Sequence, residues 1–117
     1  MSFLLKWLRL DTSARVGLRP HRNVAMELGF DAAYERCLSA IDGTLGASVY
    51  IDDRAGRLIE AGFGLINNER IRVSFDLLDA THTVVRVEAF FPAGAAILEK
   101  SAAVDALAVA LERSTSA

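Results

Sequence analysis

Residues 70–77, RIRVSFDL, decide the fold, because they form the clearest strand pattern in the chain. Apolar positions alternate with polar ones throughout: Ile71, Val73, Phe75 and Leu77 against Arg70, Arg72, Ser74 and Asp76. A period of two is typical of a strand that buries one face and turns the other to water or to a partner. The pattern therefore predicts a sheet whose two faces differ in chemistry.

Further strands and turns follow on both sides of this stretch. Upstream, the strands 47–51 and 57–65 flank the turn sequence DDRAG at 52–56, and Asn67 and Asn68 favour the next turn. Downstream, residues 79–82 turn into a strand at 84–91, which Pro92 and Gly94 end. Three consecutive hairpins predict antiparallel pairing for most of the sheet.

Two helices complete the pattern. A strand at 24–30 leads to Asp31 as N-cap of a helix over 32–45, and Gly46 is its expected stop. Its apolar stripe contains Tyr34, Cys37, Leu38, Ile41 and Leu45. The closing helix has the stripe Ile97, Val104, Leu107, Ala108 and Leu111. Whether it begins near Ala95 or only after Ser101 stays open.

These elements predict one α+β domain. The order β-α-β-β-β-β-α gives an antiparallel sheet of four or five strands with both helices packed on one face. A length of 117 residues suits one domain, and 52 % apolar residues with 24 % charged ones suit a packed globule.

We expect the domain to cover residues 23–117, preceded by a basic amphipathic N-terminal arm at residues 1–22. Five basic residues against one acid give the arm a net charge of +4, so the remainder carries −6 of the total of −2. An acidic domain argues against nucleic acid, which needs a continuous basic face. Only the arm has the charge to meet an anionic surface.

The arm combines that charge with apolar side chains. If residues 3–10 are helical, Lys6 and Arg9 fall in one narrow sector, and Phe3, Trp7 and Leu10 lie in the apolar remainder. These five residues are candidate contacts for a partner or a membrane. We expect the arm to dock on its own domain or on a second subunit, to lie on an anionic membrane surface, or to be disordered, although Trp7 and four leucines within residues 3–10 are a poor composition for disorder. The segment is too short to span a membrane, and we do not interpret it as a signal peptide.

The second candidate surface is the outward side of the sheet. Charged and glycine positions alternate out of the core there, and the candidate outer-face contacts are Glu60, Gly62, Gly64, Arg72, Arg86 and Glu88, with Arg70 nearby. The simpler interpretation is a solvated face with cross-strand ion pairs, each contributing less than about 1 kcal/mol. The glycines favour a bulge or bend in the strand, and they also permit close approach of another backbone or a ligand.

The remaining reactive residues predict no chemistry. Cys37 lies on the apolar stripe of the first helix, where burial keeps a thiol protonated, so we reject a Cys37–His82 pair. His21 and His82 lie in connecting segments without zinc spacing. The acids Asp52, Asp53, Asp76 and Asp79 lack the spacing of a calcium loop. We expect no catalytic set, no metal and no cofactor, and the single cysteine suits a reducing cytoplasm.

Taken with the turn at 52–56 and the strand at 57–61, the stretch from Phe30-Asp31-Ala32-Ala33-Tyr34 to Leu45-Gly46 resembles several small uncharacterised bacterial domains of helix-grip-like layout. The resemblance covers residues 24–113 and assigns no functional residue. It implies an apolar ligand held between the sheet and the closing helix. The core must be filled first, and Phe63, Phe75, Phe91, Ile71 and Leu111 suit that role.

We therefore expect a non-enzymatic binding or assembly module that forms a homo-oligomer or engages a protein partner. The contact would be a sheet edge, the glycine-bearing face or the N-terminal arm. One alternative is a carrier or sensor of a small apolar ligand, with a pocket between the sheet and the C-terminal helix. The other is a peripheral membrane-associated domain that binds through residues 1–22.

Overall fold

The computed structural model describes residues 20–64, 69–91 and 101–116. The elements are β1 (His21–Met26), α2 (Phe30–Ala40), η1 (Ile41–Leu45), β2 (Ser48–Asp53), β3 (Leu58–Gly62), β4 (Arg70–Asp79), β5 (His82–Phe90) and α3 (Ala102–Ser116). Their order, β-α-β-β-β-β-α, is the predicted one, with one π-helical turn, η1, after the first helix. The predicted α+β class is confirmed.

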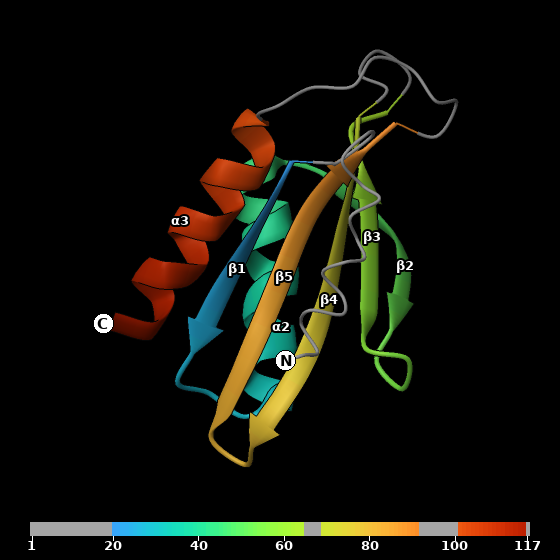
Figure 1. Cartoon of the computed structure of the whole chain (residues 1–117). Coiled ribbons are helices and arrows are strands. Elements are labelled where there is room, and N and C mark those ends of the chain that lie inside the picture. The colour runs from blue at the N-terminus through green and yellow to red at the C-terminus, as the bar shows by residue number, and fades with distance from the viewer. Residues whose placement is uncertain (1–19, 65–68, 92–100, 117) are drawn as a thin grey trace, which may run out of the picture.

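All five strands form one antiparallel sheet in the spatial order β1-β5-β4-β3-β2 (Figure 1). Consecutive strands from β2 to β5 are neighbours, as the predicted hairpins require. The first strand, β1, pairs with the last one, β5, so both ends of the sequence meet in the sheet. The predicted turn at Asn67 and Asn68 lies outside the described residues.

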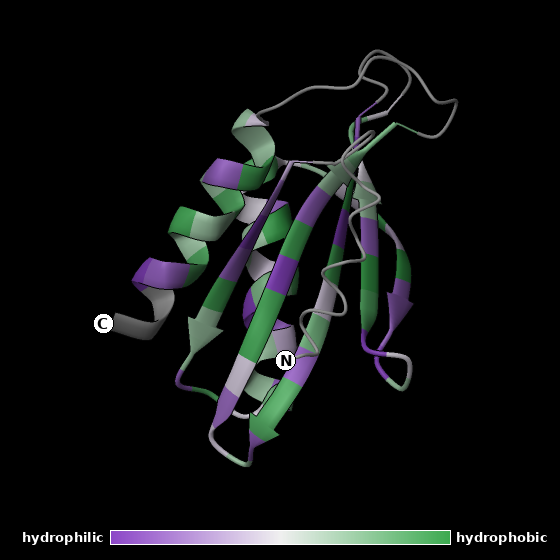
Figure 2. Ribbon diagram, in the orientation of Figure 1, coloured by the Kyte–Doolittle hydropathy of each residue, from purple (hydrophilic) through white to green (hydrophobic). Residues whose placement is uncertain are grey.

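Both helices lie on the same face of the sheet, as predicted (Figure 1). Hydropathy alternates along the strands, in bands that are clearest on β4 and β5 (Figure 2). The inward side chains of β4, such as Ile71 and Val73, are fully buried and belong to one core cluster with Tyr34 and Cys37 of α2 and Leu107 of α3. Burying a side chain of this size stabilises the fold by about 1.5–3 kcal/mol. The hydrophobic core therefore lies between this face and the helices.

The first strand begins and ends earlier than the predicted span of 24–30. Its pairing with β5 runs from His21 opposite Glu88 to Met26 opposite Thr83, and α2 begins at Phe30 with Gly29 as N-cap. The partner strand sets these limits, which the local sequence does not show. The predicted boundary between residues 22 and 23 therefore falls inside β1.

Arg22, the last residue of the predicted arm, lies in β1 and contacts the closing helix. Its guanidinium lies 3.0 Å from Asp105 and 3.7 Å from Glu112, both on α3. All three side chains are about half exposed, so each pair contributes at most about 1 kcal/mol. These ion pairs link β1 to the closing helix.

The first helix ends as predicted, with a change of winding before its end. The α-helix stops at Ala40 and continues as the π-helical turn η1. Gly46 then adopts the left-handed conformation, with φ 64°, and its N–H donates to the carbonyl of Asp42. Glycine has no Cβ penalty in this region, which makes it a suitable helix stop.

The start of the closing helix is settled by Ser101. Its hydroxyl oxygen accepts a hydrogen bond from the N–H of Val104 at 3.2 Å, and its carbonyl accepts one from Asp105 at 3.0 Å. This is N-cap geometry, so α3 begins after Ser101. The same hydroxyl donates to the Glu69 carboxylate just before β4.

Candidate functional site

We call the side of the sheet opposite the helices the outer face. Strand register places Glu60 of β3 opposite Arg72 of β4, and Arg72 opposite Glu88 of β5. His21 of β1 is the next partner of Glu88. Side chains directly opposite one another on a sheet lie within contact distance. Charges of alternating sign therefore cross the middle of the outer face.

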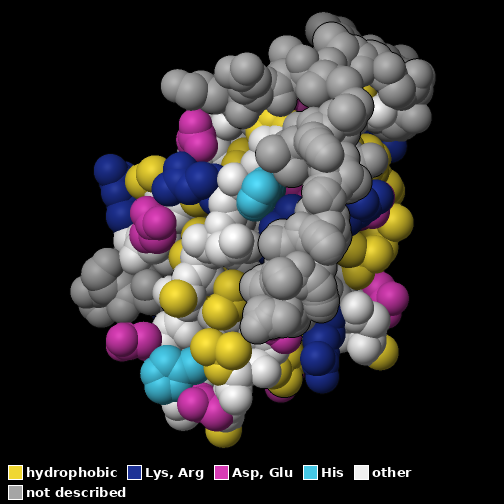
Figure 3. All heavy atoms as spheres, viewed as in Figure 1, with side chains coloured by type: hydrophobic (Ala, Val, Ile, Leu, Met, Phe, Trp, Pro, Cys, Tyr) yellow, Lys and Arg dark blue, Asp and Glu magenta, His cyan; other side chains and the backbone are white. Residues whose placement is uncertain are grey.

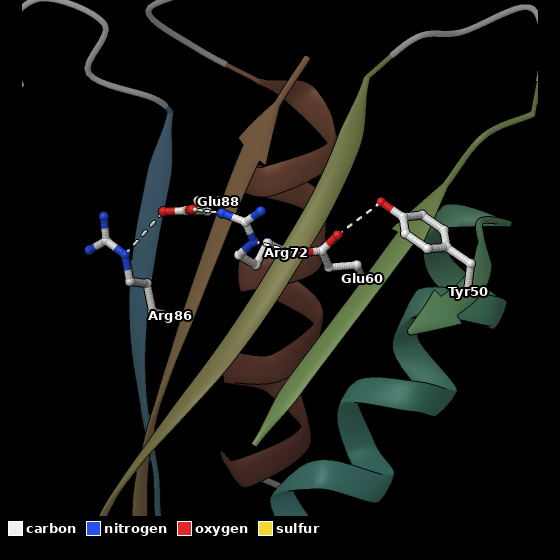
Figure 4. A network of polar contacts seen from close by, with 5 residues as sticks. All are labelled: Tyr50, Glu60, Arg72, Arg86 and Glu88. Atoms are coloured by element: carbon white, nitrogen blue, oxygen red, sulfur yellow. Dashed lines mark hydrogen bonds and ion pairs between the residues drawn. The ribbon is translucent and has the colours of Figure 1, made fainter. Parts of the chain in front are cut away.

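Five side chains form a continuous polar network there (Figure 4). Arg72 Nε donates to Glu60 Oε2 at 2.7 Å, and its Nη1 donates to Glu88 Oε2 at 3.3 Å. Tyr50 donates its hydroxyl to Glu60 Oε1 at 3.1 Å, and Arg86 Nε donates to Glu88 Oε1 at 3.3 Å. We call these residues, Tyr50, Glu60, Arg72, Arg86 and Glu88, the outer-face network.

The two carboxylates of the network are largely removed from water. The side chains of Glu60 and Glu88 are 11 % and 13 % exposed, whereas Arg72 is 34 % exposed. Burial lowers the pKa of Arg72, but its hydrogen bond to Glu60 and the charges of both carboxylates outweigh this and raise it. Arg72 thus stays charged and neutralises two largely buried carboxylates. The sequence had led us to expect solvent-exposed ion pairs at these positions.

A bulge in β2 brings Tyr50 to the network. Val49 pairs with Ala61 and Ile51 pairs with Glu60, so Tyr50 is the extra residue between them. The sequence predicted a bulge or bend at the glycines of β3, but the register shift lies opposite them, in β2. A bulge redirects a side chain, and here it turns Tyr50 toward Glu60. Without the partner strand, nothing in residues 48–53 marks the bulge.

Gly62 makes room for a second contact of Tyr50. The Arg70 guanidinium lies 5.1 Å from the centre of the Tyr50 ring. A Cβ added at Gly62 would stand 3.2 Å from Arg70 Cδ and 3.6 Å from Tyr50 Cε2. The space that a side chain at position 62 would take is therefore filled by the two neighbours, and the β3–β4 register has no shift at Gly62.

Gly64 lies beyond the end of β3. The sequence predicted a strand over 57–65, but β3 ends at Gly62 and Gly64 has φ 91°. A positive φ does not continue a strand, so the chain leaves the sheet at this point. Phe90, which was not predicted as a site residue, lies near the network instead: the Arg72 guanidinium is 4.5 Å from its ring centre. The sequence could have indicated this, because residues 86, 88 and 90 of one strand point to the same face.

A hollow of about 340 Å³ lies beside the network on β1, β4 and β5. Its lining residues are Asn23, Ser74, Phe75, Asp76, Val84 and Arg86. Asp76 is exposed and forms no ion pair with any residue in the described part of the chain. Figure 3, which looks onto the outer face, shows basic, acidic and hydrophobic side chains interspersed among the described residues.

The other reactive residues serve the fold. Cys37 is fully buried, and burial raises the pKa of its thiol to about 12, so it stays protonated. His82 is the exposed first residue of β5, with its ring Nδ1 2.9 Å from Asp79, and it is not joined to Cys37. Within residues 20–64, 69–91 and 101–116, no group of three or more histidine, cysteine or acidic side chains could hold a metal ion.

Asp52 and Asp53, considered above as cation ligands, have structural partners. Tyr34 donates its hydroxyl to Asp52 Oδ1 at 2.6 Å, which ties α2 to β2. Asp53 Oδ1 accepts the N–H of Gly56 at 2.9 Å and closes the β2–β3 turn. The guanidinium of Arg54 lies 4.6 Å from the Tyr34 ring centre and pairs with acids of α2. These contacts join α2 to β2 and to the β2–β3 turn, and we interpret them as structural.

The arm residues Phe3, Lys6, Trp7, Arg9 and Leu10 lie outside the described residues. Among the helices that are described, none is long and apolar enough to cross a membrane. No protein-family model matches the chain, and no curated protein matches it either. The helix-grip-like resemblance therefore stays a prediction.

Proposed function

We propose that this protein is a binding module that engages a protein partner through the outer face of its sheet. The observation that carries the proposal is the outer-face network, in which Arg72 holds Glu60 and Glu88 in a largely shielded position. Ordered charged and aromatic side chains lose little freedom when a partner binds, which favours affinity. Arginine and tyrosine are also enriched in protein interfaces.

The position of the network supports this assignment. Both helices pack on the opposite face, and the inward residues of α3, Val104, Leu107 and Leu111, are at most 1 % exposed. The described contact between the sheet and α3 is thus filled with side chains, which weakens the case for a ligand carrier. The outer face instead offers charged, aromatic and apolar groups together.

The chemistry of the face indicates the kind of partner. Asp76 offers an exposed carboxylate beside the half-buried side chain of Val84. Residues 23–117 carry a net charge of −6, which attracts cations over a distance. A protein segment that combines Lys or Arg with large apolar side chains fits this face best.

A labelled peptide tests the proposal. The probe is a fluorescein-labelled peptide with the sequence of residues 1–19, the part of the chain that has this composition, titrated into the full-length protein with anisotropy as readout. We expect saturable binding that Asp76→Lys weakens, because it replaces an attractive charge with a repulsive one. The matched control Val109→Lys, on the exposed side of α3, leaves the affinity unchanged.

Two results would contradict the proposal. One is the absence of saturable binding at millimolar peptide. The other is an equal loss of binding in both variants, since that would place the contact elsewhere. Light scattering on the same samples reports whether a second copy of the chain also binds, through a rise above the monomer mass of 12.7 kDa.

A further inference from the structure

The chain enters the described structure beside the outer-face network. The carbonyl of Pro20 accepts a hydrogen bond from the N–H of Ala89 in β5 at 3.0 Å. The next residue, His21, pairs with Glu88, a member of the network. Pro20, which follows the segment 1–19 in the sequence, is thereby tied to β5 beside the outer-face network.

We propose that residues 1–19 dock in cis on the outer face of their own sheet, over the hollow and the network. This inference rests on the proposed function, because the segment would compete with a protein partner for the same surface. A partner would then have to displace the segment before it binds.

The segment is long enough to reach the hollow. The hollow lies on β1, β5 and β4, within two strand spacings of β1, or about 10 Å. A connection formed by residues 11–19 spans up to about 30 Å when extended. A ten-residue helix is about 15 Å long, which equals three strand spacings. Residues 1–10 therefore fit across the face with connection to spare.

The segment also carries groups that complement Asp76 and Val84 of the hollow. Asp76 has no cationic partner among the described residues, and Lys6 and Arg9 supply two cations. The half-buried Val84 offers an apolar contact for Trp7. Four basic residues and one acid give the segment a net charge of +3, opposite in sign to the rest of the chain.

Tethering favours the same molecule over a second copy. A segment joined by a short flexible connection has an effective concentration of about 1 mM at its own face. A second copy at micromolar concentration competes poorly with that value. If the segment binds with a Kd of about 100 μM, it covers the face about 90 % of the time.

Trp7 is the only tryptophan of the chain and reports directly on docking. We expect its emission in the full-length protein to be blue-shifted and protected from acrylamide, and Asp76→Lys to shift it to the red. The double variant Lys6→Glu and Arg9→Glu, which leaves the domain unchanged, should do the same. Combining it with Asp76→Lys reverses both charges and should restore the blue shift.

The anisotropy titration separates this inference from the proposed function. Trp7→Ala in the full-length protein weakens the tethered competitor, so the labelled peptide of residues 1–19 should bind this variant about tenfold more tightly than the unchanged protein. Equal binding to both would overturn cis docking and leave the proposed function standing. Binding to neither would remove both.

Two further outcomes would overturn cis docking. A blue shift that grows with protein concentration, together with a doubled mass by light scattering, would assign the segment to a second copy. A blue shift that appears only with vesicles containing phosphatidylserine would assign it to a membrane surface.

Discussion

Removing the charge of Arg72 tests the outer-face network most directly. Arg72→Met keeps much of the aliphatic stem and deletes the guanidinium, so the loss reports mainly on the charge. Glu60 and Glu88 would be left without their shared cation while their side chains remain 11 % and 13 % exposed.

The size of the effect follows from this exposure. Breaking a buried ion pair by removing one partner costs about 3–5 kcal/mol. Because the Arg72 side chain is 34 % exposed, water enters the vacated space and reduces the penalty to about 2 kcal/mol. With a typical urea dependence for a domain of this size, the unfolding midpoint should fall by about 1 M.

Urea unfolding followed by circular dichroism measures the loss. The matched control is Arg86→Met, because Arg86 is 40 % exposed and contacts Glu88 alone within the network, so its removal should cost less than about 1 kcal/mol. A double-mutant cycle between Arg72→Met and Glu60→Gln should give a coupling energy above about 1 kcal/mol. Equal effects of the two arginine variants, or a coupling near zero, would refute this account of the network.

Three further predictions concern the fold. Burial and the hydrogen bond to Asp52 raise the pKa of Tyr34, so the neutral side chain stabilises the fold fully below pH 10. Above pH 10 this stabilisation declines by about 1.4 kcal/mol per pH unit. The urea midpoints measured at pH 9 and pH 11 should therefore differ less in Tyr34→Phe than in the unchanged protein. Gly46→Ala should cost about 1 kcal/mol by thermal unfolding because of its φ of 64°, and Gly43→Ala should not, since its added Cβ meets open space. Ser101→Ala removes the N-cap of α3 and should cost about 1 kcal/mol, measured the same way.

Each of these has a contradicting result. Parallel pH profiles for the unchanged protein and Tyr34→Phe would show that Tyr34 titrates as it does in the unfolded chain. Equal losses in both glycine variants would remove the argument from the left-handed conformation. An unchanged stability in Ser101→Ala would mean that water replaces the cap.

The sequence predicted the part of the candidate site that follows strand alternation. Glu60, Arg72, Arg86 and Glu88 share one face because a period of two fixes their direction once the strands are known. Tyr50 was missed, because a bulge moves a residue off the alternating pattern and depends on the partner strand. Gly64 was predicted to lie within the third strand, but β3 ends at Gly62, where pairing stops, and Gly64 has a positive φ.

Alternation, turn residues and helix periodicity by themselves determined the class, the element order and the side of the sheet that holds the core. These are local signals, repeated within a few residues of one another. Only the tertiary structure decided that β1 joins β5, that α3 starts at Ser101, and that one arginine serves two shielded carboxylates. Those features depend on which distant segments become neighbours, and His21 and Glu88 are 67 positions apart before the sheet closes.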